Sequence, residues 1–176
     1  MCTPENLLAL PSDPVTTDVQ AAVQLTPLKG EARPISEWTT NFHLAIVALD
    51  PYTVESSWIL ETGLRILRNY AEADVRIALL VTAPAEGVAE YVGPLADEIL
   101  VFVDADRSAV RAFGLETLPA FVHINNAHQV EAVAQGWNPA EWAGVAANLS
   151  ARMDWTQPEI PGNGDPSPFT GTPAAG

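Results

Sequence analysis

Apolar residues gather into runs of strand length along the middle of the chain. These mostly apolar runs occupy residues 44–49, 76–82, 99–103 and 120–124. A run that is apolar on both faces is typical of a strand in the centre of a sheet, where both sides are covered. A fifth strand is expected at residues 129–134, because Asn125-Asn126-Ala127 resembles a hairpin turn.

Apolar residues at helical spacing fill the intervals between these strands. The last helix begins at Asn138-Pro139-Ala140-Glu141, which combines a capping box with a proline at the first helical position. Asp104 or Asp106 is expected to cap a shorter helix that Gly114 ends. The predicted helices cover about residues 53–74, 84–92, 108–113 and 138–153.

Both ends of the chain differ from the middle. Residues 1–40 form an N-terminal extension, in which Thr17-Asp18-Val19-Gln20 predicts one or two helical turns and residues 23–26 predict an edge strand. Residues 154–176 are rich in proline and glycine and almost free of aliphatic side chains. Such a segment buries too little apolar surface to offset its chain entropy, so it is predicted to be a disordered tail.

Strands that alternate with helices and end in a hairpin and a helix predict an α/β domain over residues 41–153. Its central mixed sheet should have about five strands flanked by helices. Parallel strands come first, and an antiparallel pair completes the sheet.

The chain is acidic, with a formal net charge of −14 and a single lysine, Lys29. That charge argues against nucleic acid or an anionic membrane as partner, and it favours a protein partner with a basic surface. No apolar run approaches the length needed to span a bilayer, so no membrane insertion is expected. The start of the chain lacks a secretory pattern, which predicts a cytoplasmic protein. Cys2 is the only cysteine, which excludes an intramolecular disulfide.

One stretch resembles a known family. Residues 113–122, Phe-Gly-Leu-Glu-Thr-Leu-Pro-Ala-Phe-Val, are similar to the aromatic-glycine, turn, cis-proline and strand sequence of thioredoxin-like proteins. The N-terminal extension resembles that of the TlpA-like and peroxiredoxin-like branch. The resemblance covers about residues 20–153 and implies a thioredoxin-like fold with a cis peptide bond before Pro119.

The chain departs from that family where the redox cysteines would lie. By the resemblance, their positions map onto the degenerate stretch Thr53, Val54, Glu55 and Ser56, and the buried carboxylate that assists thiol chemistry maps onto Val47. A hydroxyl does not replace a thiolate, and no base is placed by sequence to activate it. Thiol–disulfide exchange and peroxide reduction by an internal thiol are therefore excluded, and no catalytic residue is expected. These residues are interpreted as a helix cap and first turn, with a catalytic hydroxyl as the alternative.

The resemblance also implies a peptide groove. In active relatives the backbone beside the cis-proline pairs with an extended substrate peptide. The corresponding groove here would consist of Tyr52, Leu118, Pro119 and Ala120. The alternative is that Pro119 only shapes its turn.

Aromatic residues outside the regular pattern are possible contact residues. Trp137, Trp155 and Phe169 are assigned to this group because tryptophan is enriched at binding hot spots and Phe169 stands alone in the tail. The other tryptophans, Trp38, Trp58 and Trp142, are expected on core faces.

His123 and His128 flank the predicted hairpin turn and would be cross-strand neighbours. A metal site would need His43 or Glu131 as a further ligand. Solvated hairpin histidines are the preferred interpretation, so neither a metal nor a cofactor is predicted.

Together these features predict a redox-inactive, thioredoxin-like protein that acts by protein binding, as a chaperone or assembly factor. The hydrogenase-maturation chaperones of the HyaE type resemble it in fold, charge and missing cysteines. The alternatives are an accessory subunit of a larger complex and an enzyme with non-thiol chemistry in the same cleft. An exposed apolar patch beside the Pro119 loop would favour binding, whereas a strongly perturbed titratable group there would favour an enzyme.

Overall fold

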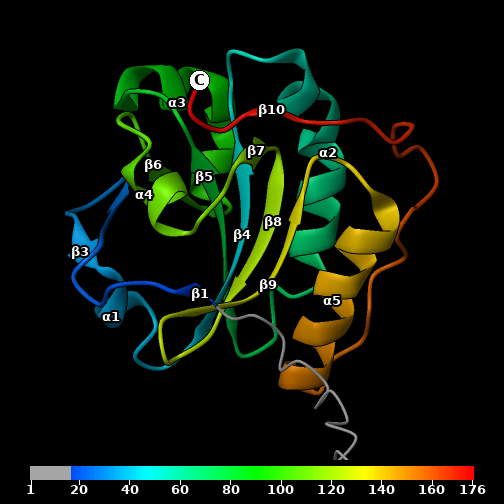
Figure 1. The fold of residues 1–176 in the computed structure, drawn as a ribbon, viewed down its shortest axis with the longest axis horizontal. Helices are drawn as coiled ribbons and strands as arrows, with labels where there is room; N and C mark the ends of the chain where they lie inside the picture. The colour runs from blue at the N-terminus through cyan, green and yellow to red at the C-terminus, as the bar shows by residue number, and fades with distance from the viewer. Residues whose placement is uncertain (1–16) are drawn as a thin grey trace, which may run out of the picture.

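The sheet is built around β4 (His43–Leu49), in which every residue after His43 is buried. β4 pairs in parallel with β5 (Val75–Val81) and antiparallel with β8 (Ala120–Ile124). The computed structural model describes residues 17–176, shown in Figure 1. Cys2 and the rest of residues 1–16 lie outside the described residues.

The central strands follow the sequence pattern. β5 also pairs in parallel with β6 (Leu100–Val103), and β8 pairs antiparallel with β9 (Gln129–Gln135). The parallel strands therefore come first and an antiparallel pair completes the sheet, as expected.

The sheet has eight strands, in the order β1-β9-β8-β4-β5-β6-β2-β3, where about five were expected. The additional strands are the short strands β1 (Thr17–Asp18) and β3 (Arg33–Pro34) at the two edges and β2 (Gln24–Pro27), which was expected at an edge but lies between β6 and β3. β1 replaces the helical turns predicted at residues 17–20, because it pairs antiparallel with β9. An edge strand of this length has too few residues to show a pattern, and its state is decided by the neighbouring strand.

Helices cover both faces of the sheet (Figure 1). One face carries α2 (Val54–Arg68), α3 (Ala85–Val92) and α5 (Pro139–Met153), and the other carries α1 (Ile35–Trp38) and α4 (Ser108–Ala112). α3 continues into a 3₁₀ turn at Gly93–Asp97. α2 ends at Arg68 rather than near Asp74, because turns take over before β5.

Residues 155–176, here called the C-terminal strap, pack against the domain and correct the expectation of a disordered tail. The strap runs back beside α5, crosses α2 near its start, where Phe169 contacts Trp58, and reaches residues 117–118 (Figure 1). There β10 (Thr172–Pro173) pairs antiparallel with β7 (Thr117–Leu118).

Polar contacts hold the strap, and they explain why a composition argument failed. Asp165 has a nearly buried carboxylate that accepts from the Arg65 guanidinium at 2.7 Å. Phe169 exchanges two main-chain hydrogen bonds of 3.0 Å with Trp137. The Trp137 indole N–H also donates to the Pro166 carbonyl at 2.8 Å. Low apolar content predicts disorder only when the polar groups of a segment find no partners on the domain.

The strap approaches β7 closely because it carries a glycine at the contact. A Cβ on Gly171 would lie 2.3 Å from the Leu118 carbonyl oxygen and 2.4 Å from the Thr117 methyl group. Such distances are far inside van der Waals contact, so a side chain here requires the backbone to move.

Gly171→Ala should release the strap from β7. We expect faster amide hydrogen exchange at Phe169 and Ala174, and a free energy of unfolding lower by about 1–3 kcal/mol, the usual cost of overpacking. Gly144→Ala is the matched control, because a Cβ there meets nothing within 4 Å. That change should leave exchange in the strap unaltered. Equal exchange in both variants would contradict the close packing of Gly171.

Candidate functional site

The turn that carries the degenerate stretch is tied together by its own side chains. Thr53 occupies the N-cap position of α2 with extended dihedrals, but its hydroxyl makes no capping hydrogen bond. It donates instead to the Asp50 carbonyl at 2.9 Å and lies 3.3 Å from the Ser56 hydroxyl. The Ser56 hydroxyl, which is buried, accepts the Asp50 N–H at 2.8 Å. Thr53 therefore occupies the expected N-cap position, but its hydroxyl does not cap the helix.

This geometry gives neither hydroxyl a general base. The Asp50 carboxylate is engaged by the Tyr52 N–H at 3.0 Å and by the Arg107 guanidinium at 2.9 Å. No hydrogen bond from Thr53 or Ser56 to a histidine or carboxylate side chain occurs within residues 17–176. A serine or threonine needs such a base to act as a nucleophile, so the turn has the properties of a structural element.

Ser56→Ala should lower stability by about 1–3 kcal/mol, because the buried Asp50 N–H then loses its acceptor. Ser57→Ala is the matched control, since Ser57 is exposed one position along the helix. Its effect should stay within about 0.5 kcal/mol. Urea unfolding of both variants measures the difference, and equal midpoints would show that the Asp50–Ser56 bond contributes nothing.

The Leu118–Pro119 peptide bond is cis, as the resemblance implied. Leu118 and Ala120 are fully buried, and Tyr52 is exposed on the other side of the turn. The strand edge beside Pro119 is occupied by the strap. Ala174 N–H donates to the Glu116 carbonyl at 2.8 Å, in addition to the β10–β7 pairing. The strap, which is an extended segment of the same chain, therefore already occupies the expected peptide groove.

Arg107 joins the end of the strap to the degenerate turn. Its guanidinium donates to the Ala174 carbonyl at 2.6 Å and to the Asp50 carboxylate at 2.9 Å. Asp50 is buried and Arg107 is mostly so, and an ion pair in that environment is screened less by solvent than a surface pair. The strap is consequently fixed at both the Pro119 edge and the start of α2.

The start of α2 presents exposed apolar side chains. Tyr52, Val54 and Trp58 are 72%, 59% and 56% exposed, and we call these three residues the helix-start patch. The Trp58 ring contacts Phe169 of the strap edge-on, with 5.6 Å between ring centroids. Trp58 was expected on a core face, but it lies on the outer face of α2, because only the opposite face packs on the sheet. A depression of about 290 Å³ adjoins the patch and is lined by Pro51, Tyr52, Ala83, Gly87, Glu90 and Tyr91.

The other tryptophans also differ in part from expectation. Trp137 is 1% exposed and packs edge-on against Trp142, so it is a core residue under the strap rather than a contact residue. Trp155 is 38% exposed, and its indole N–H donates to the Asn69 carbonyl at 2.7 Å. Trp38 and Trp142 are buried as expected.

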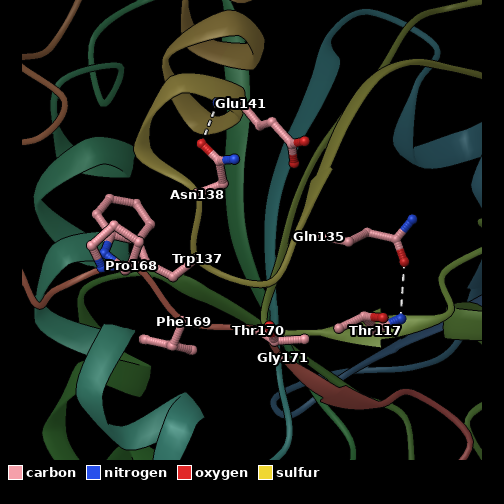
Figure 2. A pocket seen from close by; sticks show the side chains of 9 residues that line it. All are labelled: Thr117, Gln135, Trp137, Asn138, Glu141, Pro168, Phe169, Thr170 and Gly171. Atoms are coloured by element: carbon pink, nitrogen blue, oxygen red, sulfur yellow. Dashed lines mark hydrogen bonds between the residues drawn. The ribbon is translucent and has the colours of Figure 1, made fainter.

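The largest pocket lies between the strap and the start of α5, and Figure 2 shows its side chains. It has a volume of about 410 Å³, and its one ionisable lining residue is Glu141. Asn138 caps α5 by accepting from the Ala140 and Glu141 N–H groups. Gln135 accepts from the Glu116 and Thr117 N–H groups at 2.7 and 2.9 Å. The side-chain oxygens of Asn138 and Gln135 are therefore committed to the backbone, and Glu141 alone gives the pocket no acid–base pair (Figure 2).

The histidines are arranged differently from the prediction. His128 lies in the turn with a φ of 63°, and its Nδ1 atom is 2.9 Å from the Thr39 hydroxyl. Residue 132 rather than His128 opposes His123 across the strands, since the turn occupies more residues than expected. His123 instead contacts His43, with 2.7 Å between His43 Nδ1 and His123 Nε2. Asp104 and Asp106 accept main-chain N–H groups at the start of α4, in agreement with their interpretation as caps.

Two features of the molecule escaped the sequence reasoning. The strap has no apolar pattern, and its glycine at residue 171 was the one signal of close backbone approach. The His43–His123 contact crosses two strands, and it follows from register. His123 opposes Ala45, so His43 is its diagonal neighbour on the same face.

No family model matches the chain, and a search of curated proteins gives no match. Solved structures are similar to it. A peroxiredoxin Q variant from Xanthomonas campestris has a TM-score of 0.64 at 16% identity, over 81% of this chain and 99% of the other. A hypothetical protein from Sinorhizobium meliloti has a TM-score of 0.64 at 15% identity, over 91% and 93%. An exposed lipoprotein thioredoxin from Streptococcus pneumoniae has a TM-score of 0.58 at 14% identity, over 73% and 98%.

These similarities confirm a thioredoxin-like fold. Identity at this level establishes the fold and no activity. Several of the similar structures are described as thioredoxins or disulfide oxidoreductases. The single cysteine of this chain argues against that chemistry. Among residues 17–176, no helix is both long enough and apolar enough to cross a bilayer.

Proposed function

We propose that this protein acts by binding another protein through the helix-start patch, without thiol chemistry. The observation that carries the proposal is the exposure of Tyr52, Val54 and Trp58 at the end of the fold where thioredoxin-like enzymes carry their cysteines. Covering large, exposed aromatic side chains with a partner is energetically favourable. Tryptophan and tyrosine are also enriched at binding hot spots. A role as chaperone or assembly factor, in the cytoplasm, is the form of binding that we favour.

The strap determines how the partner reaches this end of the molecule. Strand-like pairing beside Pro119 requires the partner to displace residues 172–174, which are held by β7 and by Arg107. The helix-start patch is accessible without that displacement. Phe169 extends the patch through its contact with Trp58, so the strap is part of the proposed surface.

Charge supports a partner with a basic rim. The formal net charge of −14 gives the whole molecule a negative potential that steers cationic partners toward it. A partner surface with basic residues around an apolar centre would match both the negative charge of this protein and its apolar helix-start patch. Charge contributes chiefly to association rate and selectivity, whereas the aromatic residues contribute affinity.

The structure gives less support to an enzyme at this site. An enzyme would place a titratable group with a useful pKa near Pro119. Burial raises the pKa of Tyr91, which borders the depression beside Tyr52, and so keeps this phenol protonated at neutral pH. The side chain whose pKa is most strongly displaced, His123, lies four residues further along β8 and faces α5 through Asn148.

A double variant, Tyr52→Ala with Trp58→Ala, tests the binding proposal. Partners are captured from a lysate of the source organism, and the best candidate is then titrated in purified form. Hot-spot losses of about 2 kcal/mol or more predict a dissociation constant at least ~30-fold weaker for the double variant. Val133→Ala is the control, since Val133 is an exposed apolar residue on β9 outside the patch. Equal affinity of all three proteins would refute the proposal.

The absence of thiol chemistry has its own test. Insulin reduction by dithiothreitol should proceed at the uncatalysed rate in the presence of this protein, because a single cysteine cannot form the intramolecular disulfide that turnover requires. Cys2→Ser should behave identically. A rate above background that disappears with Cys2→Ser would contradict the prediction.

A further inference from the structure

A second set of chemically capable side chains lies at the other end of the sheet from Pro119. His43 begins β4, His123 belongs to β8 and Glu131 belongs to β9. In the β4–β8 register, Ala48 opposes Ala120 near Pro119, whereas Leu44 opposes Ile124 at the far end. We call His43, His123 and Glu131 the histidine–glutamate cluster.

The cluster has the dimensions of a metal site. One ligand atom from each of its residues lies within 4.8 Å of the others. The two imidazole nitrogens that face one another are 2.7 Å apart. Nitrogens bound tetrahedrally to zinc at about 2.1 Å are about 3.4 Å apart, so the rings need to separate by less than ~1 Å.

The contacts of the two imidazoles require an unprotonated nitrogen on each ring, as in the neutral form that metal coordination needs. Burial lowers the pKa of His123 to about 4, despite the opposing effect of the Glu131 carboxylate. Burial also lowers the pKa of His43. Each neutral ring has one unprotonated nitrogen, whose lone pair accepts a hydrogen bond in the metal-free protein.

Asn148 provides the outer support of the cluster. Its amide nitrogen lies 2.8 Å from His123 Nδ1, so in the metal-free protein the His123 proton is on Nε2 and bonds to His43. Coordination through Nε2 moves that proton to Nδ1, and a half-turn of the Asn148 amide lets its oxygen accept it. The proton stays on His123, and the ring orientation is fixed as in other metal-bound histidines.

Glu131 supplies the anionic ligand. Its side chain is 5% exposed and accepts from the Arg152 guanidinium through Oε1. Oε2 has one weak partner, the Asn125 amide at 3.3 Å, and this oxygen is available to a metal. Arg152 is 57% exposed, so its charge remains solvated while it orients the carboxylate.

We propose that His43, His123 and Glu131 bind one divalent transition-metal ion, with zinc the best fit. Two imidazoles and a carboxylate match the ligand preference of zinc, whereas calcium and magnesium favour oxygen ligands throughout. His43 is only half-buried, which gives the ion a path of entry and leaves a fourth position for water. The site is separate from the helix-start patch and does not depend on the proposed binding function.

The test uses the full-length chain, titrated with Zn²⁺ by calorimetry and with Co²⁺ by visible absorption. We expect one equivalent of each ion and a rise in melting temperature with zinc. His43→Ala should weaken zinc binding at least about tenfold and abolish the thermal shift. Glu131→Gln should weaken it similarly. Far-ultraviolet circular dichroism confirms that each variant is folded, and the partly exposed position of His43 makes that variant the more tolerant one.

His128→Asn is the matched control. It removes the third histidine of the chain, and asparagine tolerates the positive φ of that position. Zinc affinity should then stay within about twofold of the parent, since this residue lies outside the cluster. The proposal is overturned if zinc binds no more tightly than on the order of 10⁻⁴ M. It is also overturned if His43→Ala leaves the affinity unchanged, or if the Co²⁺ spectrum shows thiolate charge transfer from Cys2.

Discussion

The main-chain pairing of the C-terminal strap with the strand edge beside Pro119 is the interaction on which the site depends. It buries Trp137, forms one wall of the largest pocket and places Phe169 against Trp58. It also brings Ala174 to Arg107, and through Arg107 to Asp50 in the degenerate turn. Without the strap, each of these features would lose a partner. The protein thus pairs this strand edge with its own C-terminal segment, which is one of the ways in which proteins protect exposed strand edges.

The degenerate turn and the helix-start patch lie together at the start of α2 and have opposite chemical characters. Hydroxyl groups at residues 53 and 56 turn inward and hold the backbone of Asp50. The neighbouring side chains at residues 52, 54 and 58 turn outward and remain exposed. The start of α2 therefore combines hydroxyl groups that are bonded to the backbone with an exposed apolar surface. Fold similarity alone would have suggested a redox enzyme, and the side chains argue for a different use of the scaffold.

The parts of the fold that could be predicted from the sequence are those specified locally. β4 is a continuous apolar run, and Asn138 is the N-cap of α5 at the position that the sequence predicted. The parts that could not be predicted depend on partners far away in the chain. β1 is a strand because β9 lies beside it, and Trp58 contacts Phe169 because the strap crosses the outer face of α2. His43 was recognised as a possible ligand, but only the strand register places it against His123. Composition likewise predicted disorder for the strap. Composition reports how much apolar surface a segment can bury, but not which polar groups of the domain will bond to it.

The order of synthesis gives the strap a role in time as well as in space. Ribosomes make β7 before residues 155–176, at about 5–20 residues per second. Thr172 is made 54 residues after Leu118, so β7 has been made for roughly 3 to 11 seconds before the segment that covers it. During that interval the nascent domain presents an unpaired strand edge beside Pro119, and a ribosome-associated factor or a neighbouring nascent chain has access to it. Once residues 172–174 pair with β7, other chains can no longer pair with this strand edge. The edge is therefore most accessible while the chain is being synthesised.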